Sequence, residues 1–242
     1  MAKVKVKGVI VSNDDKWIYD WFDMDSTSPN DVEKEINIAN GADLEVEINS
    51  VGGDVYAGSE IYTALKSYKG NVTTKIVGIA ASAASVIAMA GKRVLISPTA
   101  QIMIHNVSSC ARGDYRDLEH EAEVLKNYNK SIASAYQLKS GMSEEELLKL
   151  MDAETWLTAK QALEYKLVDE VMFEDAPSIG LVAGINTSRI LPPEVINKMR
   201  NTINNPLKSL DEPKDNEADI FMQKKAEATF RYLKLKGVIE NE

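Results

Sequence analysis

Strand-like and helix-like patterns alternate along residues 1–174, and this alternation constrains the fold more than any other feature of the sequence. In segments 3–11 and 44–50, apolar residues recur at every second position, as expected of β-strands with one buried face. Segment 57–70 instead has the apolar spacing of an amphipathic helix and ends at a glycine. Strands that alternate with helices at this spacing predict βαβ units, a mainly parallel sheet and an α/β fold.

The remaining elements follow from the same patterns. We expect further strands over 72–78, 92–98 and 101–107, and further helices over 28–40, 114–140, 143–152 and 158–173, with a short strand at the end of the last segment. Ser28 or Asn30 can cap the first of these helices, and Ser143 with Glu146 forms a capping-box pattern. The run of Ala and Ser after Gly78 is also expected to begin a helix.

The character of the sequence changes near residue 175. Asn, Pro and charged residues become frequent and apolar periodicity fades, apart from a segment near the end with the pattern of a short amphipathic helix. We therefore predict one compact domain over 1–174, followed by a poorly ordered C-terminal extension or tail over 175–242.

Composition excludes several function classes. The formal net charge of −9 argues against nucleic-acid binding, which needs clustered Lys and Arg. The first residues have no apolar core typical of a secretory signal, and no apolar run reaches the ~18 residues of a membrane span. The single cysteine, Cys110, cannot form an intramolecular disulfide. A cytoplasmic protein is expected.

Metal and nucleotide sites are not expected either. His105 and His120 lack the spacing of a zinc-binding helix, and one cysteine cannot build a thiolate site. The glycine-rich segment 52–58 lacks the Lys-Ser/Thr ending of a phosphate-binding loop. We predict no cofactor.

Acyl-transfer chemistry is the class for which candidate residues exist. It needs a nucleophile, a base, a group that orients the base, and donors to the oxyanion. Ser82 lies where a strand ends and a helix begins, Ser85 lies one helical turn later, and His105 ends another strand. Taken singly, each of these residues is also explained as an ordinary helix-start serine or strand-end histidine, and the pair Gly52–Gly53 as a simple turn.

Together, four segments resemble the ClpP-type serine peptidases. "INSVGGDVYAGSEIY", "GIAASAASVIAMAG", "QIMIHNV" and "ETWLTAKQALEYKLVDEV" occur in the order and approximate spacing of that family, over roughly residues 8–173. The similarity is strongest to its shorter branch, the phage- or prophage-encoded head-maturation proteases.

The resemblance implies a role for each matching residue. Ser82 matches the nucleophile and His105 the general base, while Gly52 and Ala83 match the backbone donors of the oxyanion hole. The family's acid is an aspartate two residues before the aromatic of its last motif. Here Glu154 stands at that position, and Asp152 is the alternative; an exposed acidic pair without a catalytic task is a third interpretation.

The resemblance also implies an architecture and partners. The family fold, shared with crotonases, consists of repeated ββα units with a protruding handle helix, here about 114–140. Members of the family form heptameric rings that act on protein or peptide substrates. Some work with an AAA+ unfoldase, and others act on phage capsid and scaffold proteins.

The sequence departs from the family pattern at Val51, where the family usually has proline. A thiol nucleophile, with Cys110 paired to His105, is the other arrangement to consider, but it would leave Ser82 unexplained. A catalytically inactive assembly protein with the crotonase fold remains the alternative function.

Overall fold

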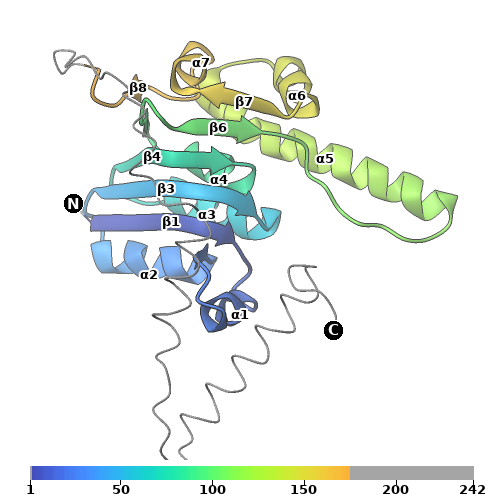
Figure 1. The fold of residues 1–242 in the computed structure, drawn as a ribbon, viewed down its shortest axis with the longest axis horizontal. Helices are drawn as coiled ribbons and strands as arrows, with labels where there is room; N and C mark the ends of the chain where they lie inside the picture. The colour runs from blue at the N-terminus through green and yellow to red at the C-terminus, as the bar shows by residue number, and fades with distance from the viewer. Residues whose placement is uncertain (1, 175–242) are drawn as a thin grey trace, which may run out of the picture. The chain divides into compact units, whose positions relative to one another are not determined.

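A single mixed sheet forms the centre of the computed structural model, which describes residues 2–174 (Figure 1). The strands are β1 (Ala2–Ile10), β2 (Ser26–Thr27), β3 (Leu44–Gly53), β4 (Val72–Ala81), β5 (Arg93–Ile96), β6 (Gln101–Ile104), β7 (Thr155–Thr158) and β8 (Glu170–Val171). The helices are α1 (Lys16–Trp21), α2 (Pro29–Ala39), α3 (Val55–Lys66), α4 (Ala83–Ala88), α5 (Tyr115–Ser140), α6 (Glu144–Asp152) and α7 (Ala159–Glu164).

The sheet is mainly parallel, as predicted. Its order is β2-β1-β3-β4-β5-β8, and β6 branches from β4 and pairs with β7. Only the β6–β7 pair is antiparallel among the described strand pairs. The α/β fold predicted from the alternation of patterns is confirmed; the predicted extension over 175–242 lies outside the described residues.

The core lies between the central strands and the helices that pack on them. Ile48, Ile76 and Ile96 of β3, β4 and β5 have no exposed surface. They meet an apolar cluster that includes Ile61 of α3 and Ile87 of α4, also fully buried. Burial of each such side chain contributes roughly 1.5–3 kcal/mol, so the strands that carry the site residues are firmly fixed.

Helix α5 extends beyond the end of the sheet, as Figure 1 shows. Its buried residues all lie in its second half, from Ile132 to Ser140. The N-terminal half therefore protrudes from the core, which confirms the predicted handle helix.

The capping residues predicted from the sequence begin two of the helices. Ser28 is the N-cap of α2, and the box of Ser143 and Glu146 caps α6, with Oγ of Ser143 accepting from the Glu146 amide. Helix α3 begins earlier than predicted because the Asp54 carboxylate accepts a hydrogen bond from the Ala57 amide, at 2.7 Å.

Three short elements were not predicted: α1, β2 and β7. Each has six residues or fewer, which is too short for a period of 2 or 3.6 to show. Strands β3 and β4 each run three residues beyond their predicted ends. This extension matters because both strands then reach the loops that carry the candidate site.

Candidate active site

Ser82 occupies a sharp turn between β4 and α4. Its backbone has φ 53° and ψ −126°, a conformation that side-chain-bearing residues rarely adopt and that costs about 1–3 kcal/mol. The small residues around it allow close packing: a Cβ added at Gly58 of α3 would lie 2.9 Å from the Ala83 Cβ. The Ala/Ser run therefore lets α4 start directly against its neighbours.

Hydrogen bonds hold the Ser82 backbone in this turn. The Ser82 amide donates to the Met103 carbonyl of β6, at 3.0 Å. The Ser82 carbonyl accepts from the Ser85 amide at 2.9 Å and from the Ser85 hydroxyl at 2.6 Å. The strained conformation is thus fixed from both sides of the residue.

A buried tyrosine of the handle helix completes this network. Tyr136 is 1% exposed, and its hydroxyl lies 2.7 Å from the Ser85 Oγ. Since the single Ser85 proton is given to the Ser82 carbonyl, the Tyr136 hydroxyl must be the donor to Ser85. Burial raises the pKa of Tyr136 far above its ordinary value, so this proton is retained. Helix α5 is in this way connected to the Ser82 turn.

The structure brings Ser82 and His105 together. The Ser82 Oγ and the His105 Nε2 are 2.7 Å apart, a short hydrogen bond. The sheet explains the contact: Ala81 of β4 is in register with Met103 of β6, so the residues just beyond these two strands are neighbours. A serine hydrogen-bonded to a histidine has the geometry of an activated nucleophile.

The two glycines after β3 differ from one another. The Gly52 amide, predicted as an oxyanion donor, donates instead to the Ser50 Oγ at 3.1 Å. Gly52 packs tightly on the turn, because a Cβ there would lie 2.8 Å from the Ser82 Cβ and its φ is +90°. Gly53 and Ala83 line the cavity beside Ser82.

The candidate acids have other partners than His105. Glu154 is exposed, and its carboxylate accepts from the Trp156 indole at 3.3 Å. Asp152 accepts from the Asn106 side-chain amide at 2.7 Å. Within residues 2–174, no hydrogen bond joins either carboxylate to His105.

The strand register nevertheless brings Glu154 close to the histidine. Ile104 pairs with Thr155 in the antiparallel β6–β7 ladder. The next position on each side of that pair is occupied by His105 and Glu154. The backbone positions therefore suit an acid–base pair, while the side chain of Glu154 is turned toward Trp156.

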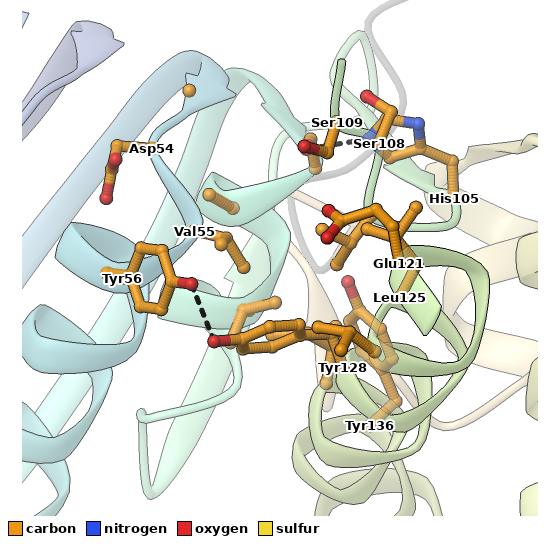
Figure 2. Close-up of a pocket in the computed structure, with 17 residues that line it drawn as sticks. Asp54, Val55, Tyr56, His105, Ser108, Ser109, Glu121, Leu125, Tyr128 and Tyr136 are labelled. Atoms are coloured by element: carbon orange, nitrogen blue, oxygen red, sulfur yellow. Dashed lines mark hydrogen bonds between the residues drawn. The ribbon is translucent and has the colours of Figure 1, made fainter. Parts of the chain in front are cut away.

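A cavity of about 380 Å³ opens next to Ser82 and His105 (Figure 2). Residues of α3, α4, α5 and the loop after His105 form its walls. Sequence reasoning did not identify three of the polar groups that line it, Tyr56, Glu121 and Tyr128. The helix pattern of 114–140 predicted α5 itself but could not show which of its residues reach the cavity.

The other candidates lie apart from this chemistry. Cys110 is free and exposed, and His120 is exposed on α5. In the part of the chain that the structure describes, no cluster of His, Cys, Asp and Glu is arranged to hold a metal ion. No helix in the same part is both long and apolar enough to cross a membrane.

A serine at a strained strand-to-helix turn, hydrogen-bonded to a histidine beside a cavity, is an arrangement that serine hydrolases on α/β folds also have. The chain belongs to the Clp protease family, whose model, described as Clp protease, matches residues 31–175.

Several curated relatives share this region. The ATP-dependent Clp protease proteolytic subunit of Bacteroides fragilis is 35% identical over 136 residues, 55% of this chain and 66% of the relative. The protein of the same name from Deinococcus radiodurans is 35% identical over 133 residues, 54% of this chain and 65% of the relative. The chain thus spans slightly less than two thirds of the length of these relatives.

A solved structure supports the fold. A mutant of ClpP1 from Listeria monocytogenes superimposes with a TM-score of 0.58 at 24% identity. The match covers 71% of this chain and 91% of that one. The ClpP-like fold expected from the sequence is therefore confirmed.

Proposed function

We propose that this chain is a serine endopeptidase in which Ser82 is the nucleophile and His105 the general base. The observation that carries the proposal is the 2.7 Å hydrogen bond between the Ser82 Oγ and the His105 Nε2. Family membership and relatives named as proteolytic subunits support it.

The reaction follows from this geometry. His105 accepts the Ser82 proton as Oγ attacks the peptide carbonyl, and then gives that proton to the leaving amine. The resulting acyl-enzyme is hydrolysed by water, with His105 again as base. The Ala83 amide stabilises the oxyanion. The second donor predicted from the sequence, the Gly52 amide, is bonded to the Ser50 Oγ. Gly53 lines the cavity, so we propose its amide as the alternative second donor.

Glu154 is the acid we propose for the third position. Its place opposite His105 in the β6–β7 register supports this, and rotation of its side chain away from Trp156 would free the carboxylate. Asp152 is the weaker candidate because Asn106 holds it.

The biological setting extends the proposal. We expect a ring of identical subunits, heptameric as in the family, that acts on peptides or unfolded proteins. One setting is the proteolytic subunit of an ATP-dependent protease, supplied by a separate AAA+ unfoldase because this sequence has no nucleotide loop. The other is a prophage protease that trims capsid or scaffold proteins. Residues 176–242, beyond the family match, favour the second, and adjacent portal and capsid genes would support it.

A second function has one observation in its favour. Because Glu154 and Asp152 are both bonded elsewhere, the chain can also be read as a crotonase-fold assembly protein that has lost activity.

Active-site labelling separates these two functions. The assembled full chain is incubated with a fluorophosphonate and its intact mass is measured, for the wild type, Ser82→Ala and Ser109→Ala. Ser109 is the matched control because it also lines the cavity. We expect one adduct, lost only in Ser82→Ala. Unlabelled wild-type protein would overturn the peptidase proposal and favour the assembly role.

A further inference from the structure

Apolar side chains form part of the walls of the cavity beside Ser82, among polar ones. Val86 lies on α4, Val107 follows His105, and Leu125 and Ile132 belong to α5. A substrate acylated on Ser82 would place the side chain that precedes the scissile bond next to these walls. The cavity is therefore suited to hold that side chain by apolar contact along its length.

One carboxylate of this lining has no hydrogen-bond or ion-pair partner among the described residues. Glu121 of α5 is partly buried and lines the cavity, and Figure 2 shows its carboxylate directed into the space between α3 and α5. Throughout residues 2–174, no hydrogen bond or ion pair engages this group. Asp54, the other acidic residue of the lining, is already bonded to the Ala57 amide. No Lys or Arg of the described chain lines the cavity.

Two tyrosines line the same cavity (Figure 2). The hydroxyls of Tyr56 and Tyr128 are 2.6 Å apart, and their rings meet edge to face at 5.5 Å. The pKa of Tyr128 is raised, first by the hydrogen bond with Tyr56 and to a lesser extent by the charge of Glu121, which lies nearby. Each ring also presents an electron-rich face that attracts cations.

We infer that Glu121 makes this cavity select a lysine or arginine side chain on the acyl side of the scissile bond. The inference rests on the proposed function. The aliphatic stem of such a side chain would lie against the apolar walls, and its charged end would donate to the free carboxylate. An apolar side chain would instead cover Glu121 and remove its water without giving it a donor, which is unfavourable.

The experiment compares two peptidyl diphenyl phosphonates that differ at one residue. One carries the lysine side chain next to phosphorus, and the other carries norleucine, which has a similar aliphatic chain and no charge. Second-order rates of Ser82 modification are measured by intact mass on assembled wild-type protein, Glu121→Gln and Glu123→Gln. Glu123 is the matched control because it lies on the same helix, exposed and paired with Lys126.

We expect the wild type to react faster with the lysine reagent, and Glu121→Gln to lower the lysine-to-norleucine rate ratio by about tenfold, as for a lost charge-assisted hydrogen bond. Glu123→Gln should leave the ratio within about twofold. Equal rates on the wild type, a norleucine preference, or a ratio indifferent to Glu121→Gln would each overturn the inference. Fluorophosphonate labelling of Ser82 in the same samples would show that the proposed function survives that outcome, and its absence would show that the proposed function itself has failed.

Discussion

The two ends of the expected triad are held very differently. At the nucleophile end, Ser82 has every backbone polar group bonded, and the supporting Ser85 and Tyr136 are buried. At the acid end, Glu154 and Asp152 are exposed and bonded to other side chains.

The difference shows which part of the site a single chain fixes by itself. The Ser82–His105 contact joins residues that the register of β4 with β6 makes neighbours, and hydrogen bonds fix the Ser82 backbone. The acid depends on the rotamer of one exposed side chain, that of Glu154, directly before the four-residue strand β7. Such a rotamer changes at a cost of about 1 kcal/mol.

The largest loss of activity should come from replacing the base or the nucleophile. His105→Ala should lower peptide cleavage by about 10⁶-fold, as should Ser82→Ala, because each removes the whole nucleophile–base unit. The double variant should be no slower than either single one in a peptide-cleavage assay. Additive losses would mean that the two residues do not act as a unit, and that the hydrogen bond between Ser82 and His105 has no role in catalysis.

A smaller effect is expected at the acid end. Glu154→Gln should slow fluorophosphonate labelling by about 100-fold, less than the ~10⁴-fold typical of a firmly held triad acid. Glu154→Asp, with a shorter carboxylate, should retain most of the rate. Asp152→Asn is the matched control and should stay within about twofold; a loss confined to Asp152→Asn would move the acid role to that residue.

The buried network that supports the nucleophile can be tested through stability and rate together. Tyr136→Phe leaves Ser85 without its donor, so the free energy of unfolding should fall by about 1–2 kcal/mol in urea titration. Labelling of Ser82 should slow by about tenfold, since the turn is less firmly fixed. The double variant Ser85→Ala/Tyr136→Phe should lose less stability than the sum of the two singles.

Tyr128→Phe provides the control for that network. It removes a hydroxyl whose partner, Tyr56, is exposed, and should change the unfolding free energy by less than about 0.5 kcal/mol. If Tyr136→Phe and Tyr128→Phe lowered the free energy of unfolding equally, burial of the hydroxyl would not determine how much each tyrosine contributes to stability.

The smallest effect concerns Glu45, a carboxylate that the sheet holds firmly, in contrast to Glu154. Hydrogen bonding to Lys75, together with Lys3, lowers the pKa of Glu45 below its ordinary value of 4.5. A depressed pKa in the folded state stabilises the protein above the unfolded pKa, and this contribution is lost as the pH falls through the folded value. Glu45→Gln should therefore cost no more than about 1 kcal/mol at neutral pH and nothing at the most acidic pH.

Thermal unfolding at several pH values measures this contribution. Lys75→Met is the matched background, because it removes the larger cause of the pKa shift, and Glu45→Gln should cost less there than in the wild type. A cost that stays the same from neutral to acidic pH would contradict the prediction, since it would arise from the shape of the side chain and not from its charge.

The sequence by itself determined the local structure and the outline of the fold. The strand and helix periods, the Ser28 cap and the Ser143–Glu146 box all involve residues within about four positions of each other, and such contacts form whenever the local segment does. The motifs around Ser82 and His105 were recognisable for the same reason, as short segments in a fixed order. Short elements such as β7 were not predicted, because they contain too few residues to show a period in their apolar positions.

Only the tertiary structure decided which side chains meet across the site. Ser85 and Tyr136 are 51 positions apart, and Tyr56 and Tyr128 are 72 apart. Such contacts depend on the rotation of α5 against the core and on the register of β6 with β7. The same long-range packing directed Glu121 of α5 into the cavity beside Ser82. No pattern within a segment encodes these outcomes, because each is set by the sum of many weak contacts between segments.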